Sequence, residues 1–200
     1  VSTLEHKGDT WVVREFSNDI LGCNAVSWAP FGARDATAAA AAAAAAAAPG
    51  DSSAPNQPAA GLRLVTGSCD NTVKFWRCDA TTHKWVEELK EGGASNALGS
   101  ADGSSGNINA AHTDWVRDVA WCPTAALAHN VVASCGEDRK VNIWTDDGVN
   151  GAWRAAALPI FAAPVWRLSW NVTGNVLAVS TGDHQVSLWK QGADQRWVQL

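Results

Sequence analysis

Short apolar runs that alternate with polar positions recur along the chain, and turns of Gly, Asn and Asp separate them. Runs of this kind, rich in Val, Ile, Leu, Phe and Trp, are typical of β-strands. They predict three successive units of four strands each. The predicted strands are 24–29, 62–67, 72–77 and 84–89, then 116–121, 130–134, 140–145 and 153–157, then 165–170, 176–180, 185–190 and 196–200. Residues 1–16 are predicted to form the last two strands of a preceding unit.

The three units are copies of one repeat. In each unit a turn aspartate precedes a Trp by six positions, and the three turn aspartates are Asp70, Asp138 and Asp183. One Trp is the last or next-to-last residue of each first strand, and another is next to last in each third strand. These are the repeat tryptophans Trp28, Trp76, Trp121, Trp144, Trp170 and Trp189. Asp138 and Asp183 are 45 positions apart, which matches the roughly 40 to 45 residues of a four-stranded propeller blade.

The second strands of the units carry no polar alternation. Val176 to Val179 and Val131 to Ala133 are continuous apolar runs, and such strands need both faces of their sheet covered. Sheets stacked around an axis meet this need, whereas a single open sheet does not. The pattern therefore predicts an all-β fold, a β-propeller of which this chain holds about three and a half blades.

Two stretches interrupt the repeat. Residues 31–61 include eleven consecutive Ala, and residues 91–110 are rich in Gly, Ser and Asn. Neither has the apolar pattern that offsets the entropy of ordering, so both are interpreted as inserts between strands. The predicted organisation of residues 1–200 is the end of a preceding blade (1–16), a blade (22–90) that contains the first insert, the second insert, a blade (111–158) and a last blade (162–200).

Composition and charge narrow the function classes. The net charge of −5 and the pI of about 5.4 give no basic footprint for nucleic acid. Five Cys without a C-x-x-C pair argue against a disulfide framework or a zinc site and favour a reducing compartment. The chain begins at Val1, contains no Met and shows no signal peptide, so we expect a fragment of a larger domain.

Three residues of the second unit, His112, Ser134 and Asp138, are the types that form a hydrolase triad. However, Ser134 precedes Cys135 and Gly136 instead of lying in the G-x-S-x-G motif of a nucleophile elbow. With Trp144, the same residues could form a hydrogen-bonded chain that satisfies buried polar groups and fixes the turn. We therefore predict a structural tetrad, no catalytic, cofactor or metal site, and no enzyme.

This tetrad, His112, Ser134, Asp138 and Trp144, resembles the polar tetrad of WD-repeat propellers. The other two units match it in part. Asp19 stands near the position of the expected His in the first unit, and residues 162–164, without a His, precede the third. Beside Trp115, Arg117 and Asp118 are interpreted as an ion pair on a propeller rim, and the alternative is that they contact a partner.

Three strings make the resemblance narrower, namely residues 22–30, 111–121 and 175–180. They are similar to the Sec-thirteen family, the small propeller subunit of the COPII vesicle coat's outer cage, which also builds the Y complex of the nuclear pore. The resemblance implies an open six-bladed propeller that an α-solenoid partner closes with a blade supplied in trans, and it makes residues 162–200 the blade that faces the gap.

The resemblance also implies a cellular setting. It implies a structural scaffold for ER-to-Golgi vesicle budding and for the nuclear pore complex, on the cytoplasmic face of the ER and of COPII vesicles and at the nuclear envelope. Expected partners are the solenoid coat protein, the Y-complex scaffold and a TOR-pathway regulatory complex, without direct nucleic acid and with membrane contact only through the coat. The alternative is another WD-repeat scaffold, such as the sister nuclear-pore propeller, a nutrient-signalling subunit or a ubiquitin-ligase substrate receptor.

Overall fold

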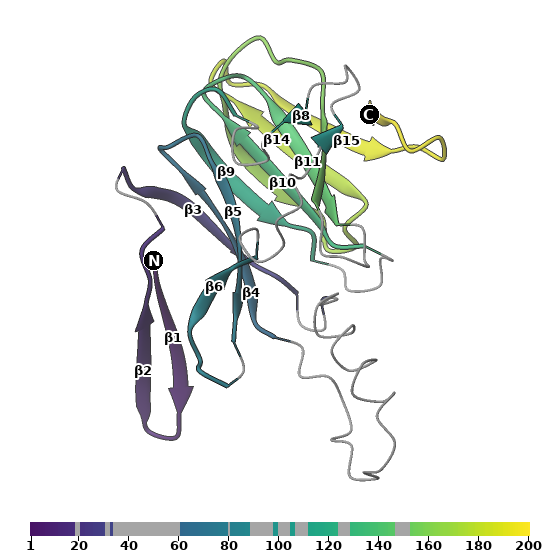
Figure 1. Cartoon of the computed structure of the whole chain (residues 1–200). Coiled ribbons are helices and arrows are strands. Elements are labelled where there is room, and N and C mark those ends of the chain that lie inside the picture. The colour runs from purple at the N-terminus through teal and green to yellow at the C-terminus, as the bar shows by residue number, and fades with distance from the viewer. Residues whose placement is uncertain are drawn as a thin grey trace.

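The computed structural model describes residues 1–18, 21–30, 33, 61–79, 81–88, 98–99, 105–106, 112–123, 129–146 and 153–200. These residues form three four-stranded antiparallel sheets and two two-stranded ones (Figure 1). In each four-stranded sheet the strands pair in chain order, as in a propeller blade. The expected all-β fold is therefore confirmed.

The strands of the three four-stranded sheets and of the first hairpin lie close to the predicted positions. We name the sheet β3–β6 the first blade, β9–β12 the second blade and β13–β16 the third blade. Their bounds are β1 (Ser2–Lys7), β2 (Thr10–Glu15), β3 (Cys23–Trp28), β4 (Arg63–Ser68), β5 (Val73–Cys78), β6 (Trp85–Glu87), β7 (Leu98–Gly99), β8 (Ser105–Gly106), β9 (Val116–Trp121), β10 (Val131–Gly136), β11 (Val141–Asp146), β12 (Trp153–Ala157), β13 (Val165–Trp170), β14 (Val176–Thr181), β15 (Val186–Gln191) and β16 (Trp197–Gln199).

Some strand bounds differ from the predicted ones. The last strands β6 and β16 are shorter than expected, whereas the last strand β12 has its predicted bounds. Within the second insert, β7 and β8, of two residues each, pair as a short hairpin that the sequence pattern did not predict. The poly-Ala run of the first insert lies outside the described residues.

The hydrophobic core lies between the blades. Between the first and second blades, Phe75 stacks on Trp153 with ring centroids 3.9 Å apart, and Trp121 meets Trp153 edge-on. A second cluster joins Ile143 of the second blade to Leu177 of the third. Fully burying one such side chain stabilises the fold by roughly 1.5 to 3 kcal/mol. This stacking explains why the central strands are apolar on both faces.

The first and second blades approach most closely at Gly67. A Cβ built on Gly67 would lie 2.6 Å from Cγ1 of Val116 and 2.9 Å from Cγ1 of Val119, closer than carbon atoms can pack. The absence of a side chain on β4 therefore lets β9 pack directly against it.

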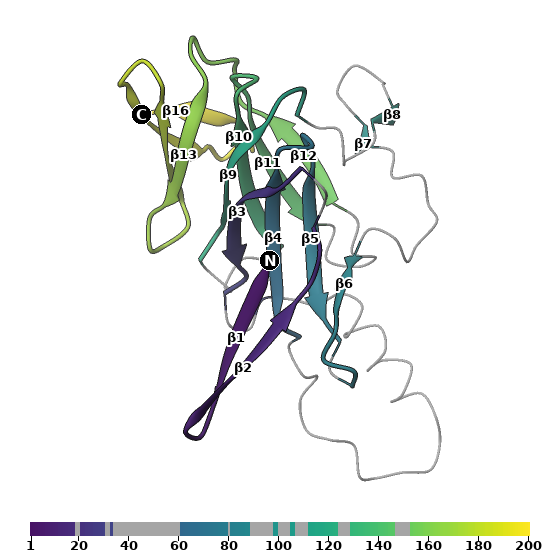
Figure 2. The ribbon, with the colours of Figure 1, turned by 90° about the vertical axis from the view of Figure 1, so that its left-hand side faces the viewer.

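The hairpin β1–β2 lies at the opposite end of the molecule from the third blade (Figures 1 and 2). Phe16, which follows the hairpin, packs against Trp76 and Trp85 of the first blade at centroid distances of 4.5 and 5.6 Å. The Trp85 indole N–H donates to the Thr3 hydroxyl at 3.1 Å. The hairpin thus touches the outer strands of the first blade through Thr3 and the adjoining Phe16, while most of its residues are exposed. Trp28 on β3 is half exposed.

Candidate functional site

The structure brings the four tetrad residues of the second blade into one hydrogen-bonded chain. The Trp144 indole N–H donates to the Ser134 hydroxyl at 2.9 Å, and the Ser134 hydroxyl lies 2.8 Å from Nε2 of His112. Nδ1 of His112 lies 3.1 Å from each carboxylate oxygen of Asp138. The chain crosses the blade from β11, through β10, to the segment before β9.

The geometry fixes the direction of each hydrogen bond. Because Nδ1 of His112 faces the Asp138 carboxylate, it carries the proton, which leaves Nε2 to accept from Ser134. Asp138 also accepts from the backbone N–H of Thr113 at 2.9 Å and of Lys140 at 3.2 Å. Burial raises the pKa of Asp138, but hydrogen bonds from His112, Thr113 and Lys140, and the positive charge that His112 carries once it is protonated, outweigh burial and hold this pKa below its ordinary value.

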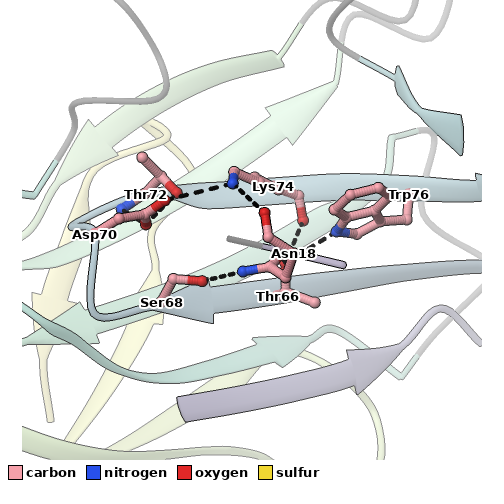
Figure 3. A network of polar contacts seen from close by, with 7 residues as sticks. All are labelled: Asn18, Thr66, Ser68, Asp70, Thr72, Lys74 and Trp76. Carbon is pink, nitrogen blue, oxygen red and sulfur yellow. Dashed lines mark hydrogen bonds and ion pairs between the residues drawn. The ribbon is translucent and has the colours of Figure 1, made fainter. Parts of the chain in front are cut away.

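In the first blade, Asn18 takes the place of the tetrad histidine (Figure 3). The Trp76 indole N–H donates to the Thr66 hydroxyl at 2.9 Å, and Thr66 in turn donates to Oδ1 of Asn18 at 2.6 Å. Lys74 connects the network to the turn, since Nζ donates to the Asn18 carbonyl at 2.6 Å and lies 3.4 Å from Asp70. Asp19, the residue expected near this position, lies outside the described residues.

In the third blade, apolar side chains replace the middle of the tetrad. The strand register aligns Val179 with Ser134, and both are fully buried. Phe161, four residues before β13 as His112 is before β9, packs edge-on against Trp189 with centroids 5.8 Å apart. The Trp189 indole N–H turns instead to the Ser187 hydroxyl at 2.9 Å. Sequence reasoning noted the missing His but not the aromatic substitute, which the four-residue spacing would have revealed.

The three turn aspartates hold equivalent turns between the second and third strands. Asp70 accepts from the backbone N–H of Thr72 at 3.0 Å, as Asp138 does from Lys140, and Asp183 accepts from the Thr181 hydroxyl. The residue that follows each aspartate has a positive φ, namely Asn71 (69°), Arg139 (64°) and His184 (66°). This backbone conformation is uncommon outside Gly, and the aspartate hydrogen bonds stabilise it.

The repeat tryptophans divide into two sets. Trp76, Trp144 and Trp189 are buried in the third strands, where each donates to a hydroxyl. Trp121 and Trp170 end first strands, and each contacts a neighbouring blade. Trp121 lies edge-on to Phe75 of the first blade, and the Trp170 N–H donates to the Ala120 carbonyl of the second blade at 3.0 Å. The sixth, Trp28, is half exposed on β3.

The expected ion pair between Arg117 and Asp118 is not formed. Nε of Arg117 instead donates to Glu137 at 2.6 Å, across the strand pair β9–β10. Asp118 accepts from the backbone N–H groups of Val119 and Leu168 at 3.0 and 2.9 Å. Neighbouring strand residues point to opposite faces of a sheet, which is why adjacent Arg and Asp side chains bind different partners.

His112, Ser134 and Asp138, the triad-like residues of the second blade, bind one another and the buried Trp144. Ser134 is fully buried, and its hydroxyl is used by both Trp144 and His112, so it faces no substrate space. Among the residues that the structure describes, no three His, Cys, Asp or Glu side chains gather in a group that could hold a metal ion. In the same described ranges, no helix is long and apolar enough to cross a membrane.

The third blade leaves apolar side chains uncovered on the face turned away from the second blade. Trp189 packs toward the second blade, and its strand neighbour Leu188 therefore points the other way. We name this surface the open face, and it is formed by Val186, Leu188, Val198 and Leu200. Their exposed fractions are 70, 44, 49 and 67%. Adjacent uncovered apolar side chains of this kind mark interaction sites.

The fold and the repeated Asp-to-Trp turn define a WD-repeat propeller. A family model described as "WD domain, G-beta repeat" matches residues 52–77, 99–145 and 159–190. These segments cover the turn and third strand of all three blades. The expected WD-repeat architecture is thereby confirmed.

Individual relatives narrow the family. The chain is 37% identical to "Protein SEC13 homolog" from Homo sapiens over 99% of this chain and 53% of that protein. It is 40% identical to "Protein transport protein SEC13" from Pyricularia oryzae over 99% of this chain and 58% of that protein. It is 44% identical to a SEC13 homolog from Dictyostelium discoideum over 70% of this chain and 40% of that protein.

The chain therefore belongs to the SEC13 family of WD-repeat proteins. It spans about half the length of the curated relatives that it matches. Of these relatives, the one from Pyricularia oryzae is named a protein transport protein.

Proposed function

We propose that this chain is part of a structural scaffold of the COPII outer coat and of the nuclear pore complex, whose propeller is completed by strands from an α-solenoid partner. The family resemblance suggests these two assemblies, and the name "Protein transport protein SEC13" of a relative agrees with a transport role. The proposed locations are the cytoplasmic face of the ER and of COPII vesicles, and the nuclear envelope.

The open face of the third blade is the observation that carries this proposal. Between the other blades, the corresponding faces bury their apolar residues against a neighbouring sheet. On the third blade, Val186 and Leu188 of β15 and Val198 of β16 lack such a neighbour among the described residues. Strands from a partner would cover these side chains and continue the stack of blades, as one sheet packs face to face on another.

The proposed partners are those that the family resemblance implies. An α-solenoid coat protein would supply the strands in the vesicle coat, and a Y-complex scaffold protein would supply them in the nuclear pore. A TOR-pathway regulatory complex is a third proposed assembly. Membrane contact would come only through the coat, and the acidic net charge of −5 gives no basis for direct nucleic-acid binding.

A tethering experiment tests the proposal. The strand segment of the solenoid partner is fused after Leu200 in the full-length protein through a flexible linker, and melting temperature and solubility are compared with the unfused protein. Binding to the native state stabilises it by mass action, so the fusion should melt at a higher temperature. A scrambled strand segment on the same linker is the control. Equal melting temperatures for the two fusions would contradict the proposal.

A further inference from the structure

The turn aspartates of the first two blades are each bound by a nitrogen-bearing side chain. In the first blade, Nζ of Lys74 lies 3.4 Å from Asp70 (Figure 3). In the second blade, Nδ1 of His112 lies 3.1 Å from Asp138. Asp183 of the third blade differs, because no Lys, Arg or His forms an ion pair with it among the residues that the structure describes.

Two substitutions remove the cation from the third blade. Lys74 lies on the third strand of its blade, two positions before the repeat tryptophan, and Ser187 holds this position in the third blade. The strand register agrees, since Lys74 pairs with Thr66 and Ser187 pairs with Val179. A serine hydroxyl is too short to reach the turn as the lysine ammonium does. Phe161, at the position of the tetrad histidine, carries no charge.

A pocket lies beside the turn aspartate that lacks a cation. It has a volume of about 310 Å³. Asp183, Ser187 and Trp189 of the third blade line it, together with Ile160 and Phe161 of the segment before β13. Its size is near the lower limit of ligand pockets, roughly 300 Å³, which suits one long side chain better than a large ligand.

The lining of the pocket combines a negative charge with uncharged acceptors and an apolar wall. Hydrogen bonding, chiefly from Thr181, holds the pKa of Asp183 below its ordinary value, so the carboxylate is ionised at neutral pH. The side-chain amides of Gln185 and Gln199 also line the pocket, and their oxygens can accept hydrogen bonds. A lysine side chain matches this lining, because it carries three N–H donors on an aliphatic stem that packs along apolar surface.

We propose that this pocket receives a lysine side chain of a partner protein, whose ammonium group binds Asp183 as Lys74 binds Asp70 in the first blade. The first blade is the template for this contact, since Nζ of Lys74 also donates to the Asn18 backbone carbonyl at 2.6 Å. The net charge of −5 favours the approach of a basic segment. An apolar residue beside the lysine would cover Ile160, which is 68% exposed.

This inference goes beyond the proposed coat function and does not depend on it. The pocket lies on the face of the third blade that carries Trp189, and Leu188 of the open face points the other way. Val186 is the one residue that belongs both to the described lining and to the open face. A partner strand on the open face and a lysine in the pocket are therefore separate contacts, which different variants test.

Fluorescence anisotropy on the full-length protein tests the proposal. The probe is a fluorescein-labelled Gly-Leu-Lys-Leu-Gly peptide, and the comparison peptide has norleucine in place of lysine, which keeps the aliphatic stem without the ammonium. The lysine peptide should bind about fivefold more tightly, the upper range for an accessible ion pair. Asp183→Asn should remove this preference. Asp194→Asn is the matched control and should retain it, because Asp194 is an accessible aspartate, 63% exposed, in the turn between β15 and β16.

A variant that supplies the lysine from the chain itself gives a second test. Ser187→Lys places a lysine at the position of Lys74, where its own ammonium can bind Asp183 and fill the pocket. It should weaken binding of the lysine peptide by at least about fivefold. It should also melt at a higher temperature than Ser187→Met, which has similar length without the charge. Equal melting temperatures for these two variants would contradict the assigned ion pair.

Several further results would overturn the proposal. These are no binding of the lysine peptide at millimolar concentration, equal binding of the two peptides, loss of the preference in Asp194→Asn, or undiminished binding to Ser187→Lys. Competition by spermidine at the peptide's own concentration would show a general cation site and would also overturn it. If Asp183→Asn lowers the melting temperature, Ser187→Lys remains decisive, because it leaves Asp183 and its turn in place.

Discussion

Phe161 packs edge-on against Trp189 in the third blade, in the position from which His112 approaches Ser134 and Trp144 in the second. Two blades of one chain therefore hold the same strand arrangement by different means. In the second blade, buried polar groups satisfy one another, and in the third, burial of Val179 and Phe161 replaces them. The two solutions respond differently to mutation, because removing one partner of a buried hydrogen bond leaves the other unsatisfied.

Ser134→Ala should lower the free energy of unfolding by about 1 to 3 kcal/mol, since it leaves the Trp144 N–H and Nε2 of His112 without their shared hydroxyl. The matched change in the third blade, Ser187→Ala, should have a smaller effect, because Ser187 is partly exposed and water can replace its hydroxyl. Urea denaturation of the full-length protein measures both. Equal effects of the two substitutions would contradict the buried polar chain described for the second blade.

Asp138→Asn should weaken the protein most at neutral pH. The hydrogen bonds and charge around Asp138 hold its pKa below the ordinary value, so its ionised form stabilises the folded state. That contribution is fully present above the unfolded pKa of about 3.9 and is lost as the pH falls through the lower folded value. The difference in unfolding free energy between wild type and variant should therefore narrow between about pH 5 and pH 3. A difference that stays constant over this range would be inconsistent with the assigned ionised carboxylate.

Gly67→Ala should destabilise the contact between the first and second blades by about 1 to 3 kcal/mol, as overpacking of a close-packed core does. The new Cβ would lie 2.6 Å from Cγ1 of Val116. Val116→Ala removes that methyl group, so the double variant should be more stable than the sum of the single effects predicts. Strict additivity in a double-mutant cycle would show that the two residues do not meet.

Replacing residues 31–61 with a short Gly/Ser turn should change the unfolding free energy by less than about 1 kcal/mol, because loop length has a weak effect on stability. The strands β3 and β4 remain hydrogen-bonded on both sides of the insert, since the Ala29 N–H donates to the Arg63 carbonyl at 2.9 Å. The same replacement of residues 91–110 is a second case. A larger loss in thermal unfolding would mean that the removed residues pack on the blades.

The period-two pattern and the Asp-to-Trp spacing predicted the blades well, because both arise from local physics. Side-chain alternation determines which residues lie on each face of a strand, and the aspartate turn determines where the following strand begins. In the second blade, the sequence also gave all four residues that form the hydrogen-bonded tetrad.

Features that depend on the exact register of paired strands could not be predicted in the same way. The bulges at Asn24, Arg117 and Trp166 leave no mark on the alternation, and they become visible only when the ladders are aligned. The partner of Arg117 was missed for a related reason. Glu137 is close because β9 and β10 pair in a shifted register, whereas Asp118 is adjacent only in sequence.

Binding of the solenoid partner's strand segment to a full-length Leu188→Asp variant tests the central claim most directly. Leu188 lies in the open face, 44% exposed, where strands from the partner would bury a carboxylate at a large desolvation cost. The matched control is Val172→Asp, since Val172 is 88% exposed in the turn between β13 and β14. Isothermal titration calorimetry should show binding to wild type and to Val172→Asp, and at least about a tenfold weaker interaction with Leu188→Asp. Equal affinity of all three proteins for the segment would contradict completion of the propeller at this face.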